Sequence, residues 1–184
     1  MNKMLIICGP SGGGKSVLER TLCSNYNFRK LMQVTTRKPR QDESYGNPYI
    51  FVTDEDFEKN KSQLIGRLGV SENTIFKDKY GTIPTTEKTK YILTAILAEE
   101  AIFDFLTSTF QRENKFETLI IGVNGSDTLL QSNARDGRGA EFIKKEREVL
   151  NLADIVIKND ANSFIDAQKV VNIINLIRPG FLNN

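Results

Sequence analysis

A glycine-rich segment near the N-terminus has the residue types and spacing that hold a nucleoside triphosphate. The pattern G-x-x-x-x-G-K-[ST] is matched by Gly9-Pro10-Ser11-Gly12-Gly13-Gly14-Lys15-Ser16. In such a loop the backbone N–H groups point at phosphate oxygens, Lys15 bridges the outer phosphates, and the Ser16 hydroxyl is placed to ligate Mg²⁺. We therefore predict triphosphate binding by residues 11–16, a property shared by GTPases, ATPases and small-molecule kinases.

A second group of residues has the chemistry of a phosphate site. Arg37 and Arg40 flank a proline-stiffened turn, and Tyr49 and Tyr80 follow downstream. Two guanidinium groups and two phenolic hydroxyls can hold a phosphate dianion through charge-assisted hydrogen bonds. On these residues alone, an exposed basic turn with two core tyrosines is the alternative interpretation.

The composition of the chain excludes several other classes of function. The 184 residues contain 25 Lys and Arg against 23 Asp and Glu, no His, and two Cys. The net charge of +2 is too small to drive general binding to nucleic acid or a membrane surface. Without His, a His-based catalytic triad and a His/Cys metal site are excluded. We expect a reduced cytoplasmic protein of one domain, acting on small molecules as a monomer or homodimer.

The elements that must position these groups alternate along the chain. Apolar runs of strand length predict buried strands at 4–8, 91–97, 118–121 and 155–157. Apolar residues at helical spacing predict helices at 16–23, 99–110, 141–152 and 163–177, the last opened by a capping box at Ser163. This alternation predicts a three-layer α/β domain with a parallel sheet.

Two segments interrupt the alternation of strands and helices. Residues 34–85 are rich in Thr, Tyr, Gly and Pro and predict a small inserted β-rich lobe. Residues 124–140 are polar, basic and contain several glycines.

The order and spacing of these motifs resemble the guanylate kinase family over nearly the whole chain. The matching elements are the loop at 9–16, the T-T-R-x-P-R stretch at 35–40, Tyr49, Tyr80-Gly81-Thr82, Gly137-Arg138-Gly139 and the segment ending in Asn159-Asp160. The resemblance implies a P-loop NTPase fold with a core of 1–33, 86–123 and 148–184, a nucleoside-monophosphate-binding lobe at 34–85 and a short lid at 124–147.

The resemblance also implies roles for individual residues. It assigns binding of the acceptor nucleotide to Gln33, Arg37, Arg40, Tyr49, Glu72, Tyr80 and Thr82. Lid arginines fall on Arg138, with Arg135 as a substitute for a second, and near Glu146 with Arg147 as its neighbour. Asn159 falls on the adenine side of the ATP site. The implied catalytic groups are Lys15, Arg37, Arg138 and Arg147, with Ser16 on Mg²⁺ and ATP as phosphoryl donor.

The chain departs from the family at the positions that read guanine. Gln33 stands where the family has Ser or Thr, the lobe Glu falls on Ser71 or Glu72, and the two strand acids are replaced by Thr94 and Ile96. We therefore predict an ATP-dependent kinase acting on GMP, dGMP or a related nucleotide. The alternatives are a kinase for a modified nucleotide or phosphorylated sugar, and a non-catalytic module that binds phosphopeptides.

Overall fold

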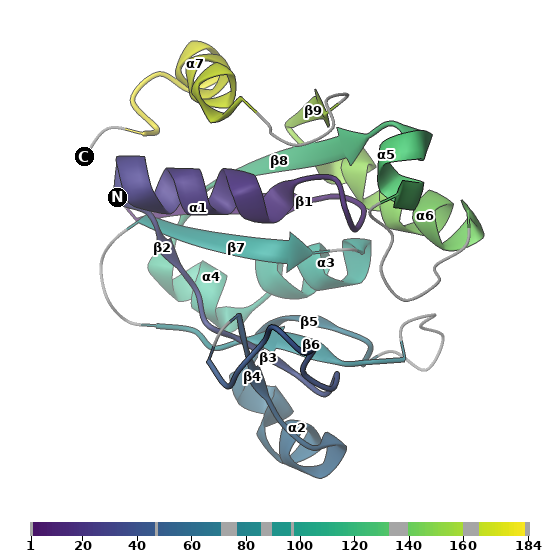
Figure 1. The fold of residues 1–184 in the computed structure, drawn as a ribbon. Helices are drawn as coiled ribbons and strands as arrows, with labels where there is room; N and C mark the ends of the chain where they lie inside the picture. The colour runs from purple at the N-terminus through teal and green to yellow at the C-terminus, as the bar shows by residue number, and fades with distance from the viewer. Residues whose placement is uncertain are drawn as a thin grey trace. The chain divides into compact units, whose positions relative to one another are not determined.

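The computed structural model describes residues 2–46, 48–70, 77–85, 90–96, 98–132, 140–159 and 166–182. They form two compact units (Figure 1). The core unit comprises Met1–Lys30, Thr89–Ala98 and Glu117–Asn184, and the lobe unit comprises Leu31–Lys88 and Glu99–Phe116.

The core unit is built on a five-stranded sheet in which every neighbouring pair is parallel. Its order is β2 (Arg29–Lys30), β7 (Lys90–Ile96), β1 (Lys3–Cys8), β8 (Glu117–Gly125) and β9 (Ile155–Asn159). The central strand β1 pairs with β7 on one side and β8 on the other, so its apolar residues are buried on both faces. The predicted α/β fold with a parallel sheet is confirmed.

Helices cover one face of the core sheet. The α1 helix (Lys15–Tyr26) and α7 (Ala167–Ile177) pack on it through one hydrophobic cluster. That cluster includes Leu5 and Ile7 of β1, Leu18 of α1 and Ile174 of α7. This cluster packs α1 against β1, the strand that precedes it in the chain.

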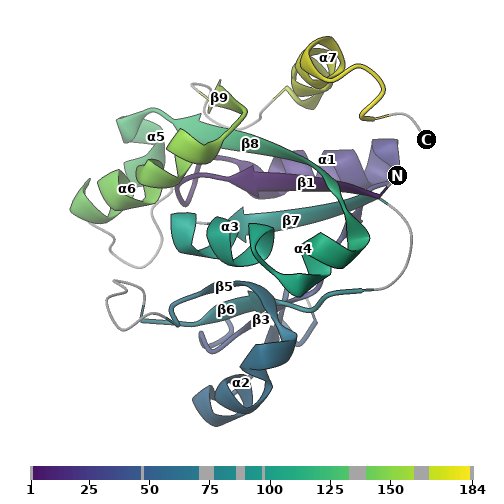
Figure 2. The ribbon, with the colours of Figure 1, turned by 180° about the vertical axis from the view of Figure 1, so that it is seen from behind.

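The opposite face of the core sheet receives the 3₁₀ helix η2 (Glu148–Leu152). A Cβ at Gly122 would lie 2.8 Å from the Leu150 side chain and 3.1 Å from that of Ala153, so the strand and η2 approach closely there. Figure 2 shows α5 (Asp127–Ser132) and α6 (Ala140–Arg147) at the end of the sheet where β1 and β8 finish. Among the described residues, no helix is both long enough and apolar enough to cross a membrane.

The lobe unit contains the predicted β-rich insertion as a four-stranded mixed sheet. Its order is β4 (Tyr49–Phe51), β3 (Gln33–Thr35), β6 (Tyr80–Thr82) and β5 (Ile65–Leu68). One face is apolar, where Val34, Phe57 of α2 (Asp54–Asn60) and Leu64, after η1 (Lys61–Gln63), form a cluster. Because side chains alternate along a strand, residues 33, 35, 49, 51, 80 and 82 share the other face.

The segment predicted as one helix at 99–110 is two helices, so that prediction is wrong. The α3 helix (Glu99–Leu106) ends before Ser108, and the Ser108 hydroxyl accepts from Gln111 N at 3.1 Å to begin α4 (Thr109–Asn114). We expected residues 99–116 in the core, but they belong to the lobe unit. There Asp104 of α3 binds the guanidinium of Arg67 on β5.

Two further helix predictions need correction. The helix expected over 141–152 is α6 followed by the 3₁₀ helix η2. The helix expected from Ser163 begins at Ala167, and its N-cap is Asp166, whose side chain accepts from Lys169 N at 3.2 Å. Ser163, the predicted N-cap, lies outside the described residues.

Candidate functional site

The glycine-rich loop connects β1 to α1 in a conformation that requires glycine. Gly9, Gly12 and Gly14 have φ angles of 129°, 81° and 104°, which L side chains rarely adopt. A Cβ on Gly9 would also lie 2.2 Å from the carbonyl oxygen of Val123 on β8. The loop therefore lies directly against the neighbouring strand, and helix α1 begins at Lys15 with Gly14 as its N-cap.

Side chains from three elements hold the loop. Lys15 is buried and its Nζ donates to the carbonyls of Gly9 and Pro10, at 2.8 Å each. Asn159, buried at the end of β9, donates from Nδ2 to the Gly13 carbonyl at 3.0 Å. The carboxylate of Glu146 on α6 accepts from both the backbone N–H and the hydroxyl of Ser11.

The donor set at the loop fits Mg²⁺ bound with a nucleotide. Ser16 is exposed in the first turn of α1, immediately after the loop. Within the described ranges, no three His, Cys, Asp or Glu side chains form a cluster that could hold a metal. Mg²⁺ in nucleotide sites takes few protein ligands and completes its shell with phosphate oxygens and water. Ser16 would hold the metal in this way.

In the lobe unit, the face of the sheet opposite the apolar cluster carries several of the predicted acceptor residues. Tyr49, Gln33 and Thr82 are register partners across β4, β3 and β6. Tyr80 lies two residues before Thr82 on β6, on the same face of the sheet. Its ring centroid is 6.0 Å from that of Tyr49. The structure thus brings four of the predicted acceptor residues, Gln33, Tyr49, Tyr80 and Thr82, onto one face.

Arg37 and Arg40 lie at the edge of this face and are joined by Glu43. Arg37 Nη2 donates to both carboxylate oxygens of Glu43, at 2.9 and 2.8 Å, and Arg40 N donates to Oε2 at 2.9 Å. The Arg37 guanidinium also lies 5.6 Å from the ring centroid of Tyr49. Burial alone would lower the pKa of Arg37, but the hydrogen bond and charge of Glu43 raise it. Arg37 therefore keeps its charge and its position.

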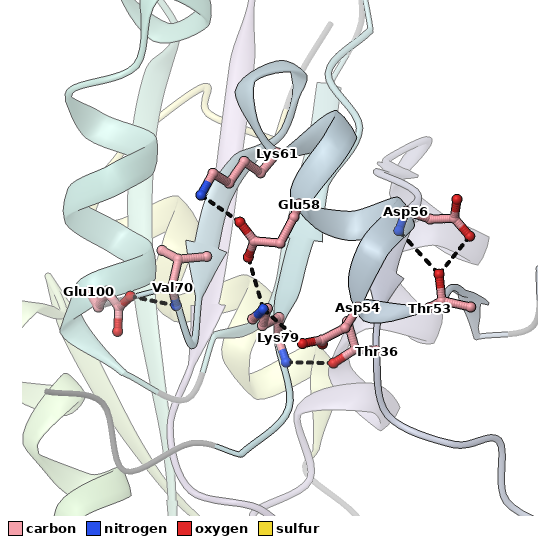
Figure 3. Close-up of polar contacts among 9 residues, drawn as sticks. All are labelled: Thr36, Thr53, Asp54, Asp56, Glu58, Lys61, Val70, Lys79 and Glu100. Carbon is pink, nitrogen blue, oxygen red and sulfur yellow. Dashed lines mark hydrogen bonds and ion pairs between the residues drawn. The ribbon is translucent and has the colours of Figure 1, made fainter. Parts of the chain in front are cut away.

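Lys79 fixes the segment that carries Arg37 (Figure 3). Its backbone N–H donates to Thr36 Oγ1 at 2.9 Å, and its carbonyl accepts from Thr36 N at 3.1 Å. Its Nζ reaches α2, with Asp54 Oδ2 at 3.0 Å and Glu58 Oε1 at 2.8 Å. Hydrogen bonds from Lys61 and Lys79 lower the pKa of Glu58 to about 2. Lys79 thereby links α2 to the residues next to Arg37 and Tyr80.

Thr82 and Gln33 are buried polar side chains on the acceptor face. Thr82 has no exposed surface and Gln33 is 5% exposed. The Thr82 hydroxyl oxygen has no hydrogen-bond partner among the residues that the structure describes. A buried hydroxyl without a partner is costly, and a bound ligand would remove that cost.

Several predicted site residues lie elsewhere or outside the described ranges. Glu72, Arg135 and Arg138 are outside them, and of Thr94 and Ile96 the structure describes only the backbone of β7. Arg147 lies at the end of α6, where its Nε donates to Asn124 Oδ1 at 3.1 Å. Sequence reasoning missed Glu146 as a contact of the loop, because nothing in the local pattern shows a carboxylate 135 residues away.

A parallel sheet whose central strand runs through a glycine-rich loop into a helix defines a P-loop nucleotide-binding protein. The model of the guanylate kinase family, described as "Guanylate kinase", matches residues 1–104, more than half of the chain. The chain therefore belongs to the guanylate kinase family.

Two curated relatives each match less than half of this chain. A guanylate kinase of Aster yellows witches'-broom phytoplasma is 45% identical over 58 residues, covering 30% of this chain and 28% of the relative. A guanylate kinase of Mesomycoplasma hyopneumoniae strain 7448 is 33% identical over 90 residues, covering 48% and 44%. The matched stretches thus span less than half of these relatives' length.

A solved structure supports the fold over nearly the whole chain. The crystal structure of guanylate kinase from Anaplasma phagocytophilum matches with a TM-score of 0.71, covering 97% of this chain and 87% of that one. The two sequences are 20% identical over this match, so the likeness concerns the fold.

Proposed function

We propose that the protein transfers the γ-phosphate of ATP to a nucleoside monophosphate, with GMP or dGMP as the first candidates. The observation that carries this proposal is the cluster of Arg37, Arg40, Tyr49 and Tyr80 on the lobe sheet, in a chain that also has a complete phosphate-binding loop. A nucleotide hydrolase binds only one phosphorylated substrate, at the loop, and uses water as the acceptor. A second site suited to a phosphate dianion implies a second phosphorylated substrate.

Phosphoryl transfer needs positively charged groups in fixed positions and little acid–base catalysis. The acceptor phosphate is itself the nucleophile, which agrees with a chain that has no His. Lys15 and the loop N–H groups would hold the outer phosphates of ATP, and Arg37 and Arg40 the acceptor phosphate. Arg138, with Arg135, would close over the transferring group and exclude water.

Bound Mg²⁺ would neutralise charge on the outer phosphates of ATP. Of the described residues, Ser16 is the one we assign to it, because its exposed hydroxyl follows the loop. Asn159 supports ATP binding through the Gly13 carbonyl.

The identity of the acceptor base depends on Gln33, Thr82 and Glu72. A Gln amide offers an NH₂ donor group beside a carbonyl acceptor, and a Thr hydroxyl can donate or accept. The guanine Watson–Crick edge presents O6 as acceptor and N1–H as donor, which an amide matches, but adenine also presents one donor and one acceptor. The buried amide of Gln33 can therefore pair with either base, which makes a kinase for another nucleotide the second candidate.

The test is ADP release from ATP and Mg²⁺ with a panel of ribo- and deoxyribonucleoside monophosphates. We expect turnover with GMP or dGMP. Arg37→Lys should lower kcat/KM for the acceptor on the order of tenfold to a hundredfold, since Lys cannot bind bidentately, with KM for ATP nearly unchanged. Arg112→Lys, on the exposed surface of α4, is the matched control.

The other outcomes of this panel separate the alternatives. Turnover with a different monophosphate alone would make the protein a kinase of altered specificity. ATP binding without transfer to any monophosphate would contradict the proposal and direct the search to phosphorylated sugars or a phosphopeptide. We expect the protein to act in the cytoplasm, where these nucleotides are made, as a monomer or homodimer.

A further inference from the structure

Glu146, in the last turn of α6, is a fully buried carboxylate bonded to the phosphate-binding loop. Its side chain has 0% exposed surface. Oε2 accepts from the Ser11 backbone N–H at 2.9 Å, and Oε1 accepts from the Ser11 hydroxyl at 3.2 Å. Burying a carboxylate is costly unless it is hydrogen-bonded. Each carboxylate oxygen accepts a hydrogen bond from Ser11, which ties this loop residue to α6.

The loop needs such a contact, because its own residues do not define one conformation. Gly9, Gly12 and Gly14 all have positive φ, and glycine loses more conformational freedom on ordering than any other residue. Ser11 lies between the first two of these glycines. By binding both the N–H and the hydroxyl of Ser11, Glu146 fixes the first half of the loop, while Asn159 fixes the second half at Gly13.

Arg147, the next residue, anchors the end of α6 that carries Glu146. Its Nε donates to Asn124 Oδ1 at 3.1 Å, and its Nη2 donates to the Gly125 carbonyl at 2.9 Å. Its Nη1 lies 2.6 Å from Asp127 Oδ1. Asn124 and Gly125 end strand β8, which pairs with β1 just before the loop. The helix end is thus placed relative to the strand that carries the loop.

We propose that Glu146 is a positioning residue for the triphosphate, held in place by Arg147. It orders the loop before nucleotide binds, so less conformational freedom is lost on binding. Glu146 acts through Ser11 and makes no contact with phosphate itself. The inference rests on the proposed function in one respect, that the loop binds ATP.

The test is direct titration of ATP and, separately, of GMP into the folded protein by calorimetry. Glu146→Ala should raise the Kd for ATP on the order of tenfold or more, because a charged acceptor of two hydrogen bonds is lost. The Kd for GMP should change less than about twofold, since the acceptor residues lie in the lobe unit. Glu146→Gln keeps an oxygen acceptor for Ser11 N and should restore most of the affinity.

A matched control removes a carboxylate from the same region of the chain. Glu148 forms an exposed ion pair with Lys145, with Oε2 to Nζ at 2.6 Å. Glu148→Ala should leave both dissociation constants unchanged, because exposed pairs contribute little. An equal loss of ATP affinity in the Glu148 and Glu146 variants would contradict the proposal.

Each remaining outcome also decides the question. ATP binding by Glu146→Ala equal to that of the parent, or an equal loss for ATP and GMP, would overturn the positioning role. If Glu146→Ala does not fold, Glu146→Asp and Ser11→Ala carry the test. The shorter side chain of Asp withdraws the carboxylate from Ser11, so each variant should weaken ATP binding, and the double variant should lose less than the sum of the two effects; additive effects would overturn the positioning role. If the parent itself does not bind ATP, the proposed function fails with it, and the parent titration alone shows this.

Discussion

Cys8, the residue before the loop, is a thiol that burial makes unreactive. It ends β1, has no exposed surface, and its burial raises the pKa of the thiol to about 12. The charge of Lys15 acts in the opposite direction and is outweighed. Because the thiolate is the reactive form, Cys8 stays an unreactive core residue beside a nucleotide site.

This raised pKa makes stability depend on pH in the alkaline range. The ordinary thiol pKa is 9.0, so above pH 9 the unfolded chain loses a proton that folded Cys8 retains to about pH 12. The contribution is present in full below pH 9 and is lost as the pH rises, by up to about 1.4 kcal/mol per pH unit. Cys8→Ala should remove this dependence, as measured by urea unfolding at pH 8, 9.5 and 10.5. Identical slopes in parent and variant would contradict the burial argument.

At the residue scale, residue types and spacing predicted most of the candidate loop and acceptor residues. Lys15, Ser16 and the glycines follow from a local motif, and Arg37, Arg40, Tyr49 and Tyr80 follow from the resemblance. The structure places the last four around one face of the lobe sheet, with Arg37 and Arg40 sharing Glu43. Glu146 was not predicted as a loop contact, because a contact between α6 and the loop is set by tertiary packing.

At the scale of elements, α3 and α4 show where periodicity misleads. Apolar residues continue at helical spacing from 99 to 110, so the pattern predicts one helix. Ser108 instead caps α4, and Phe110 then turns toward Phe116, with ring centroids 5.1 Å apart. A Ser within a helical pattern is compatible with a cap or an interior position, and packing of Phe110 against Phe116 favours the cap here.

The start of α7 gives a direct test at this scale. Asp166 caps the helix, so Asp166→Ala should lower the free energy of unfolding by about 1 kcal/mol, measured by urea denaturation. Ser163→Ala is the matched control, because the sequence pattern alone favours Ser163 as the cap. A larger loss of stability from the Ser163 change than from the Asp166 change would show that the helix begins earlier than Ala167.

At the scale of the whole molecule, the chain carries two groups of candidate phosphate ligands, one on each sheet. The parallel sheet of the core unit presents the loop, and the mixed sheet of the lobe unit presents Arg37, Arg40 and the tyrosines. Alternating strands and helices predicted the first sheet, and the β-rich composition of 34–85 predicted the second. The assignment of 99–116 was not predictable, because it depends on α3 packing against β5 through Asp104 and Arg67.

We propose that the γ-phosphate moves from ATP, bound at the loop of the core unit, to a nucleoside monophosphate bound at the arginines and tyrosines of the lobe unit. The most direct measurement is incubation with ATP carrying a radiolabelled γ-phosphate, Mg²⁺ and GMP, followed by separation of the products. We predict that the label appears in GDP, and that it does not when Mg²⁺ is chelated or when Lys15→Ala or Arg37→Ala replaces the parent. Label released only as inorganic phosphate, or label retained in ATP with every nucleoside monophosphate offered, would contradict the account.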